Sequence, residues 1–322
     1  MSVLVADIGG TNARLAIVDA LGTVQQLRKF KVKNHAGPED VLSIYLDEFT
    51  GPSPEVFCAG VAGPVSHNKV RLTNHNWQID GRELAQRFGF KSANLINDFV
   101  AQAWALPHLS SDDLLPIGSF VDDIKPLSTK LVLGPGTGMG VAAMAFAGHQ
   151  PVVINGEGGH IGLAPECEED IELLRLLHRR YQRVSVEHVL CGSGLVVLYN
   201  TLAEIRGEQA KVLEPRDIVA LADDEAEQID GICRQAVAIF CRLLGGFAGD
   251  MALSFGAFGG TYLTGGVSKA LKHYLPTSSF RKHFEAKGPM AGFVADIPTF
   301  LVVSDTSALA GAAAYVKHSL ES

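Results

Sequence analysis

The sequence has few cysteines, and they form no recognisable pattern. There are five among 322 residues, scattered along the chain, with no CxxC pair and no histidines at zinc-ligand spacing. A disulfide framework and a structural zinc site are therefore disfavoured. We expect reduced thiols in a cytoplasmic protein.

Positive charge is also scarce. The chain has 27 Lys and Arg residues against 35 Asp and Glu, a net charge of -8 at pH 7, and no basic run longer than two residues. A nucleic-acid-binding surface is therefore disfavoured, although backbone N–H groups can still hold a small anion locally in a negative protein.

Long hydrophobic runs are absent as well. The residues up to Asp7 lack the basic start and long apolar stretch of a signal peptide, and the longest uncharged run, 131–156, is interrupted by prolines and glycines. Hydrophobic residues still make up 47% of the chain. We therefore expect a soluble protein with full cores in two domains of about 150 residues each.

Glycine, in contrast, is abundant: the chain has 34, whereas average usage predicts about 23 for this length. One cluster, DIGGTN at 7–12, lies between apolar runs at 3–8 and 15–18 and predicts a hairpin with a glycine turn. A second, GPGTGMG at 134–140, lies between two further apolar runs. Two turns of the same design, one near each domain start, predict a duplicated unit that holds one ligand between two lobes.

The remaining pattern mixes strands and helices. Short apolar runs predict strands, and apolar residues at helical spacing predict helices. The predicted strands are 24–32, 56–61, 93–96, 259–266 with a glycine turn, and 300–303. The predicted helices are 38–49, 99–106, 168–181, 185–190, 195–204, 226–253 and 307–318. The polar segment 110–130 has no clear period, and we interpret it as a linker between the domains.

The first glycine turn carries polar side chains on both sides. Gly9 and Gly10 alone would suit any tight hairpin turn, which needs positive φ. Such a turn has no need of Asp7 before it or of Thr11 and Asn12 after it. With exposed backbone N–H groups these side chains form a suitable cradle for phosphate and hydrated Mg²⁺.

The second glycine turn is a weak signal alone. No acidic residue follows it at dinucleotide-binding spacing, and the chain has no GxxxxGK[ST] motif. A flexible hairpin explains it equally well until it is paired with the first turn.

Asn97 and Asp98 follow the predicted strand 93–96 and precede a predicted helix. Either residue could cap that helix, which would stabilise it by about 1 kcal/mol. The carboxyl end of a strand in an α/β sheet is also where ligands bind, so Asp98 could act as a base. The residues alone leave both roles open.

A glycine-rich loop, NGEGGH at 155–160, carries Glu157 and His160. Isolated polar residues in loops are usually just solvated, but glycines on both sides let a ligand approach the backbone closely. Glu187 has the weakest local case, because a charged residue on an exposed helix face is the default.

Together these residues resemble the bacterial glucokinase family, within the hexokinase and actin-like ATPase superfamily. The resemblance covers nearly the whole chain, and the order and spacing of its motifs are specific. The motifs are DIGGTNARL at 7–15, LTNHNW at 72–77, LINDF at 95–99, LGPGTGMGVA at 133–142, GEGGHI at 156–161, SVEHVLCGSGLVVLY at 185–199 and LTGGV at 263–267. The segment 305–311 departs from the family, whose tail usually has Pro and Gly-Leu-Leu-Gly there.

The resemblance implies a role for each candidate residue. Asp98 would be the general base that takes the proton of the sugar's 6-hydroxyl. The sugar-binding residues would be Asn97, Asp98, Glu157, His160 and Glu187. The ATP-binding residues would be Asp7, Ile8, Gly9, Gly10, Thr11, Asn12, Gly136, Thr137, Gly138, Gly265 and Gly266. Asp7 would orient Mg²⁺ through water.

The resemblance also implies an α/β fold: the two-lobed actin-like ATPase (ribonuclease H-like) fold, with duplicated mixed sheets flanked by helices and a central cleft. Its domains would be 1–108 with 305–322, and 109–304. The implied activity is ATP-dependent phosphorylation of D-glucose at the 6-hydroxyl, feeding glycolysis. The implied protein is a cytoplasmic homodimer that uses ATP and Mg²⁺ and binds neither nucleic acid nor membrane.

Three other functions compete with this one. A sugar-responsive repressor would need a DNA-binding helix-turn-helix before the first glycine turn, where this sequence has six residues before Asp7, and its relatives carry a cysteine-rich zinc cluster. An actin-like ATPase would share both turns but has no need of INDF with GEGGH. A nicotinamide dehydrogenase would need the fingerprint that 134–140 resembles only loosely.

Overall fold

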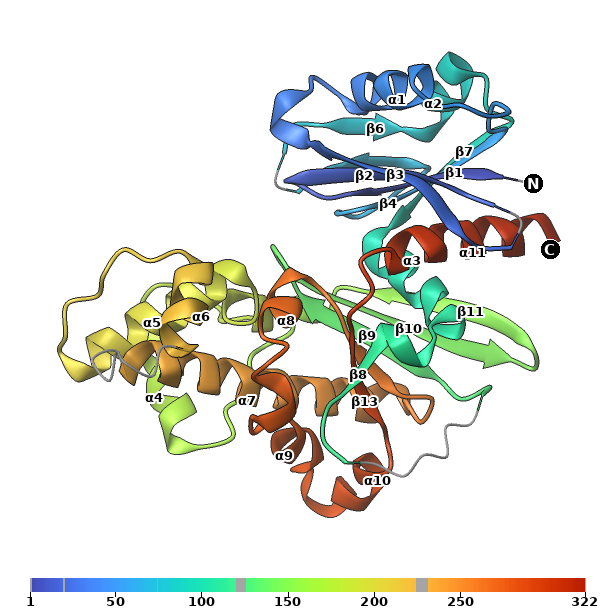
Figure 1. Ribbon diagram of the computed structural model, residues 1–322. Helices are drawn as coiled ribbons and strands as arrows, with labels where there is room; N and C mark the ends of the chain where they lie inside the picture. The colour runs from blue at the N-terminus through green and yellow to red at the C-terminus, as the bar shows by residue number, and fades with distance from the viewer. Residues whose placement is uncertain (1, 20, 74, 120–125, 224–230, 322) are drawn as a thin grey trace. The chain divides into compact units, whose positions relative to one another are not determined.

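The structure is a computed structural model that describes residues 2–19, 21–73, 75–119, 126–223 and 231–321 (Figure 1). The chain divides into two compact units. Unit 1 contains residues 1–110 and 304–322, and unit 2 contains residues 111–303. Each unit is built on a main sheet of its own.

Among its described residues, unit 1 has a five-stranded sheet in the order β3-β2-β1-β4-β7 and a small β5-β6 ribbon. β2 pairs antiparallel with β1 and β3, whereas β4 runs parallel to β1 and β7 parallel to β4. The strands are β1 (Val3–Ile8), β2 (Asn12–Val18), β3 (Val24–Lys31), β4 (Val56–Val61), β5 (Lys69–Arg71), β6 (Gln78–Asp80) and β7 (Ser92–Asn97). The helices are η1 (Val32–Asn34), α1 (Pro38–Asp47), α2 (Gly81–Phe88), α3 (Asp98–Ala105), η2 (Leu106–His108) and α11 (Ser307–Glu321).

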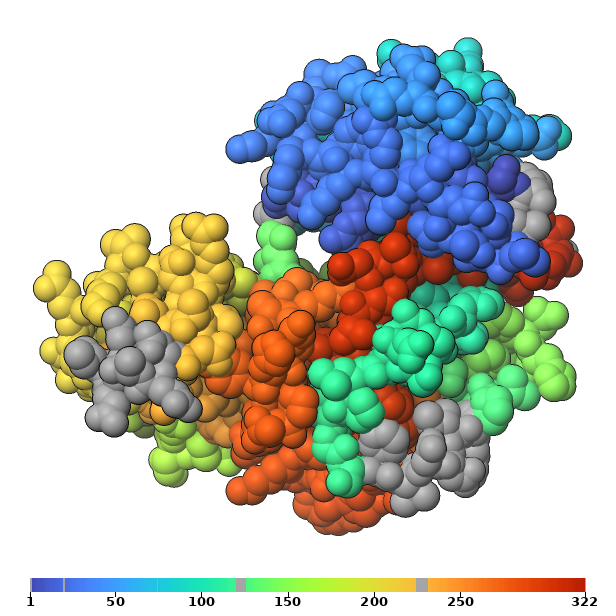
Figure 2. Space-filling model, viewed as in Figure 1, coloured from blue at the N-terminus to red at the C-terminus, as the bar shows by residue number. Residues whose placement is uncertain are grey.

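The central strand β1 is buried on both faces because helices cover both sides of the sheet. Leu4 and Ala6 belong to a core that includes residues of α1 and α2, whereas Val3 and Val5 pack with residues of α11. Alternate side chains of a strand point to opposite faces. An uninterrupted apolar run is therefore what a strand between two helix layers requires. α11 lies along α3 and against β1 and β2, beside the N-terminal strands in the space-filling view (Figure 2).

Among its described residues, unit 2 has a six-stranded sheet in the order β11-β10-β9-β12-β13-β8. Its strands are β8 (Leu114–Pro116), β9 (Lys130–Pro135), β10 (Met139–Ala147), β11 (Gln150–Gly156), β12 (Thr261–Leu263) and β13 (Thr299–Val302). Its α-helices are α4 (Glu168–Leu177), α5 (Gly192–Arg206), α6 (Pro215–Asp223), α7 (Gly231–Phe255), α8 (Gly266–Ala270), α9 (Phe280–Glu285) and α10 (Ala291–Ala295). Its 3₁₀ turns are η3 (Ser111–Asp113), η4 (Gly158–His160), η5 (Val186–His188), η6 (Leu275–Thr277) and η7 (Gly288–Met290).

The two main sheets repeat one plan. In each, a central strand (β1 or β9) continues through a glycine turn into an antiparallel strand (β2 or β10), and a third antiparallel strand follows (β3 or β11). Two parallel strands complete the other side, β4 and β7 in unit 1 and β12 and β13 in unit 2. The predicted α/β fold with duplicated mixed sheets is therefore confirmed. β8 is an addition at the edge in unit 2.

The long helix α7 is the core helix of unit 2. Its 25 residues are apolar and long enough to cross a membrane, yet 72% of its most apolar window is buried inside the protein. Phe240, Leu244 and Phe247 on this helix belong to the main core. The buried helix predicted at 226–253 is confirmed from residue 231 onward, while residues 226–230 lie outside the described residues.

The segment 110–130 is more than a linker. It contains β8, which pairs antiparallel with β13 at the edge of the sheet, and it ends at the first residue of β9. The interpretation as a linker was wrong because β8 has three residues, too few to show a two-residue period.

Two further predicted elements differ from the structure. The segment 185–190 forms the short turn η5 and no α-helix. The strand expected at 259–266 is the shorter β12 (Thr261–Leu263), and the glycines after it lead directly into the helix α8, which was not predicted. Both segments are brief, so tertiary contacts decide their conformation rather than local propensity.

Arg281 on α9 joins several segments of unit 2. Its guanidinium donates to the carbonyl oxygens of Ile297 and Ala295, both at 2.6 Å, and to Thr299 Oγ1 at 3.2 Å. Its Nε donates to Glu285 Oε1 at 2.5 Å. Because Arg281 is buried, these carbonyl groups would find no other donor if the guanidinium were removed.

We expect Arg281→Met to lower the free energy of unfolding by about 3 kcal/mol, since it leaves several buried acceptors unpaired. Urea denaturation followed by circular dichroism measures this change. The matched control is Arg216→Met, at an arginine whose side chain is 87% exposed, and it should change stability by less than about 0.5 kcal/mol. Equal losses in both variants would contradict the role given to Arg281.

Candidate active site

Strand pairing brings the candidate residues of unit 1 to one edge of its sheet. Ile8 at the end of β1 lies opposite Val61 of β4, and Val61 lies opposite Asn97 of β7. β1 and β7 are thus two strands apart, about 10 Å at the usual strand spacing. The turn at 9–12 and the start of α3 therefore lie at the same carboxyl edge, where α/β sheets bind ligands.

The turn at 9–12 is held by the backbone, with the Gly9 N–H donating to the Asn12 carbonyl at 3.0 Å. Neither Gly9 nor Gly10 is in the left-handed region, so the expected need for positive φ does not explain these glycines. A Cβ on Gly9 would have only the Asn12 carbonyl oxygen nearby, at 3.8 Å. The glycine leaves space beside the backbone that a ligand can enter.

Asp7 is paired across the hairpin with Arg14. The two residues lie opposite each other in the β1–β2 register, and Arg14 Nη1 donates to Asp7 Oδ2 at 3.3 Å. The side chains are 24% and 31% exposed, so solvent reaches both. Sequence reasoning gave Arg14 no role, although the predicted hairpin already places it opposite Asp7.

Asn12 carries an unusual polar atom: its Oδ1 is buried and has no hydrogen-bond partner among the described residues. A buried acceptor without a partner costs stability unless a ligand or water satisfies it. It lies in the turn that was predicted to hold phosphate.

The start of α3 separates the roles of Asn97 and Asp98. Asn97 is the N-cap, and its Oδ1 accepts from the N–H groups of Phe99 at 2.9 Å and Val100 at 3.4 Å. Asp98 lies in the first helical turn, and its Oδ1 accepts from Phe99 at 3.0 Å. Because Asn97 caps the helix, capping does not require the carboxylate of Asp98.

A surface hollow in unit 1 lies near Asn97. Asn97 Nδ2 donates to the carbonyl of Gly63 at 3.3 Å. The residue after Gly63, Pro64, lines the hollow. Its lining residues are Pro64, Arg71, Leu72, Thr73, His75 and Asn76. Most of them belong to the LTNHNW segment, which sequence reasoning used for the resemblance without giving it a role.

Strand pairing has the same effect in unit 2. Val141 of β10 lies opposite both Gly156 of β11 and Leu133 of β9, and Leu133 lies opposite Leu263 of β12. The turn after β9, the loop after β11 and the turn after β12 therefore leave the sheet at one edge. These three connections carry the candidate residues of unit 2.

The turn at 136–138 lies against the start of α5. The Gly136 N–H donates to the Gly138 carbonyl at 2.7 Å, and the Gly192 N–H donates to the Gly136 carbonyl at 2.9 Å. A Cβ on Gly136 would meet nothing within 4 Å. The N-terminal end of a 15-residue helix therefore adds its partial positive charge beside open backbone. Sequence reasoning missed this contribution from Gly192.

Glu187 reaches across 48 residues to the end of that turn. Its Oε2 accepts from the Met139 N–H at 2.7 Å. A Cβ on Gly138 would lie 2.4 Å from the same carboxylate oxygen, so only glycine leaves room for this contact. Glu187 is thus a partner of the glycine turn. It does not lie on a solvated helix face, which was the default expectation from the sequence.

His160 and Glu157 lie near Glu187. His160 Nε2 is 4.0 Å from Glu187 Oε1, and the His160 N–H donates to the Glu157 carbonyl at 3.0 Å. The two segments are joined by the backbone, because Val186 N–H donates to Ile161 and Leu163 N–H donates to Val184. The loop that carries Glu157 and His160 therefore lies against the segment that carries Glu187, and side chains of these types can donate to and accept from hydroxyl groups.

Gly265 and Gly266 lie where β12 ends and α8 begins. Gly265 has φ +91, and a Cβ there would also lie 2.4 Å from the Pro135 carbonyl oxygen. Gly265 thus needs both left-handed backbone and close approach to the end of β9. A Cβ on Gly266 would meet nothing within 4 Å, so this residue again leaves open space.

Comparisons with known proteins agree with this geometry. The family model for glucokinase matches residues 4–319. A glucokinase of Saccharophagus degradans is 38% identical over 317 residues, covering 97% of each chain. The crystal structure of a glucokinase from an Antarctic psychrotroph is 35% identical, covers 98% of both chains and superposes with a TM-score of 0.87.

A more distant structure shares the fold alone. The ROK family glucokinase of Streptomyces griseus, solved with glucose and AMPPNP, is 19% identical over 97% of this chain and 98% of its own, with a TM-score of 0.68. At that identity the likeness extends to the two-sheet architecture.

We expect Gly138→Ala to accelerate amide hydrogen exchange at Met139 by about tenfold or more, because the new Cβ displaces the carboxylate that accepts from this N–H. Nuclear magnetic resonance of the labelled protein measures it. Gly136→Ala is the matched control, since its Cβ meets open space, and should leave the exchange of Met139 unchanged. Unchanged exchange in Gly138→Ala would show that the contact does not depend on the glycine.

Proposed function

The chain belongs to the glucokinase family, and from this premise we propose that it transfers the γ-phosphoryl group of ATP to the 6-hydroxyl of D-glucose. The products are glucose 6-phosphate and ADP, which supply glycolysis. The family match over residues 4–319 carries the proposal. The glucose and AMPPNP held by the Streptomyces griseus structure support the same pair of substrates.

We assign sugar recognition to Asn97 and Asp98 of unit 1 and to Glu157, His160 and Glu187 of unit 2. Sugar hydroxyls both donate and accept, so carboxylates, an amide and an imidazole can read their positions. The Glu187 Oε2 is already occupied by the Met139 N–H. Its other oxygen, on the side of His160, is the one left to accept from a hydroxyl.

We assign the base to Asp98. It lies at the carboxyl edge of the sheet, and its neighbour Asn97 caps the helix. In this role the carboxylate takes the proton from the attacking 6-hydroxyl as the O–P bond forms. The proton passes to Asp98 and the ADP leaving group takes the electron pair of the broken P–O bond.

The phosphates of ATP would lie on the glycine turns. Gly9 and Gly136 leave open space beside backbone N–H groups, and the start of α5 adds a favourable dipole for an anion. The remaining nucleotide contacts follow the resemblance, with Gly265 and Gly266 nearest the nucleoside.

The residues of the first turn also fit a hydrated Mg²⁺. The Asp7 carboxylate is partly exposed, and the unsatisfied Oδ1 of Asn12 is an acceptor for a bound water or phosphate ligand. Among the described residues no group of three or more His, Cys, Asp or Glu could hold a metal, so these residues would hold the ion through water. When bound, Mg²⁺ supplies charge neutralisation for the phosphates.

The protein's work in such a transfer is positional. The transition state of phosphoryl transfer is loose, so residues mainly orient the acceptor oxygen in line and offset charge with backbone dipoles. Water competes with the sugar for the γ-phosphate, and induced fit to the sugar is the usual means of suppressing hydrolysis. We further propose that the protein acts in the cytoplasm as a homodimer.

We expect Asp98→Asn to lower kcat by about 10² to 10⁴ because the base is lost. The fold should survive, since Asn97 supplies the cap, and thermal unfolding checks this. An Asp98→Asn protein with near-normal kcat would remove Asp98 from the role of base.

We expect ADP release to depend on glucose, which a coupled assay with and without the sugar measures. Turnover at the same rate without sugar would point to an actin-like ATPase, and the absence of turnover under both conditions would point to a binding module such as a repressor. The Asp98→Asn variant serves as the control for contaminating kinases.

A further inference from the structure

The loop at 157–167 in unit 2 carries Glu157 and His160 but contains little regular structure. Its start follows β11, and its middle is tied to 184–186 by backbone hydrogen bonds. Its far end is tied by two side chains: Glu166 contacts the segment that contains His283 and Lys287, and Cys167 Sγ accepts from Arg242 Nη1 on α7 at 2.7 Å.

Lys287 is one side-chain partner of Glu166. Its side chain is 6% exposed, and its ammonium contacts Glu166 Oε1 at 3.3 Å and Asp250 Oδ1 at 2.8 Å. It also donates to the Gly246 carbonyl at 2.9 Å. Three acceptors match the three donors of a lysine ammonium, so the buried charge is fully paired.

The second oxygen of Glu166 is also used. It lies 2.6 Å from His283 Nδ1. The backbone N–H of Glu166 donates to Asp170 Oδ2 at 2.9 Å, and Asp170 is in turn paired with Arg242 on α7 at 2.9 Å. Glu166 is therefore held by both its side chain and its backbone. In each case the partner, Lys287 or Asp170, also contacts a residue of α7.

Two glycines in the middle of α7 make room for this arrangement. A Cβ on Gly246 would lie 2.5 Å from Glu166 Oε1, and its nearest contacts are all atoms of the Glu166 side chain. A Cβ on Gly249 would lie 2.5 Å from Lys287 Cε and 2.3 Å from the Phe284 carbonyl oxygen. Glycine inside a helix costs stability relative to alanine, so these residues need a reason, and the space taken by Glu166 and Lys287 supplies it.

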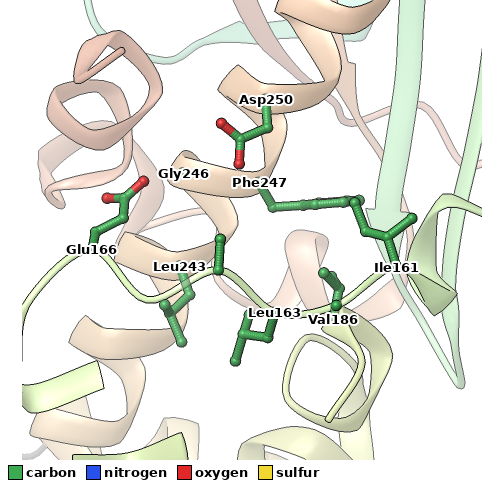
Figure 3. Close-up of a pocket in the computed structure, with 10 residues that line it drawn as sticks. Ile161, Leu163, Glu166, Val186, Leu243, Gly246, Phe247 and Asp250 are labelled. Atoms are coloured by element: carbon green, nitrogen blue, oxygen red, sulfur yellow. The ribbon is translucent and has the colours of Figure 1, made fainter. Parts of the chain in front are cut away.

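Apolar packing between the loop and α7 is incomplete. A cavity of about 20 Å³, room for one water molecule, lies between them and is lined by loop residues such as Leu163 and helix residues such as Phe247. Figure 3 shows Gly246 on the helix between Glu166 and Asp250, with the loop passing alongside. The ionic contacts of Glu166 therefore add to apolar contacts, such as that of Leu163 with the core, in attaching this loop.

We propose that Glu166, Lys287 and Gly246 form a clamp that positions the 157–167 loop, and through it His160 beside Glu187, for sugar binding. Glu166 and Lys287 are positioning residues that do not touch substrate. The assignment of sugar binding to this loop rests on the proposed function. Its contacts lie on the loop that carries His160, so we expect the clamp to affect sugar binding more than ATP binding.

The test compares Glu166→Gln and Gly246→Ala with wild type in steady-state kinetics. Each variant should raise the KM for glucose by about tenfold and leave the KM for ATP within about twofold. Gly246→Ala is the sharper variant, because alanine favours the helix more than glycine, so a loss of sugar affinity would come without a loss of helix stability. The matched control is Glu204→Gln, which removes an ion pair with Arg180 elsewhere in unit 2 and should change neither KM.

Amide hydrogen exchange provides a readout that does not depend on activity. Residues 158–166 should exchange about tenfold faster in Glu166→Gln and Gly246→Ala than in wild type or Glu204→Gln. If wild type fails to phosphorylate glucose, the proposed function fails, and the exchange result still decides whether the clamp exists. Unchanged exchange in both variants, or equal rises in both KM values, would overturn the clamp.

Discussion

In-register strand pairing decides where chemistry can occur in both units. The row Ile8–Val61–Asn97 ends three parallel strands of unit 1 at one edge. In unit 2 the parallel strands β9 and β12 end near one edge, where the antiparallel β10 begins. A slip of one residue would turn every side chain to the other face. The positions of the polar side chains that follow the strand ends are therefore set first by this register and only then by their own contacts.

Within unit 2 one hydrogen bond connects the glycine turn at 136–138 with the segment that carries Glu187. The Met139 N–H meets the Glu187 carboxylate, which links the glycine turn to a residue that also lies beside His160. One oxygen of Glu187 therefore holds a backbone N–H group, and under the proposed function the other accepts from the sugar. The Met139 N–H therefore fixes the position from which this carboxylate would act under the proposed function.

The sequence predicts the strands and turns of the fold well because apolar runs bounded by glycine are strong local signals. The elements it misses include α2, whose sequence is largely polar, the amphipathic helix α6, and β8, which is three residues long. At the candidate site, Asn97 and Asp98 could be located because they follow a strand. The sequence could not show that Asn97, and not Asp98, is the N-cap of the helix. Glu187 was assigned by resemblance alone, since its partner is 48 residues away.

The glycines show why composition alone could not reveal their purpose. Gly265 is in the left-handed region, Gly136 faces open space, and Gly246 faces the carboxylate of Glu166. The first needs a particular backbone conformation, the second leaves open space, and the third makes room for a side chain from a distant loop. A sequence records the same residue in each case. The distinction arises only in the folded protein, where another segment either lies against the position of the missing Cβ or leaves it open. A surplus of glycine therefore predicts that some group comes close to the backbone, but not which group.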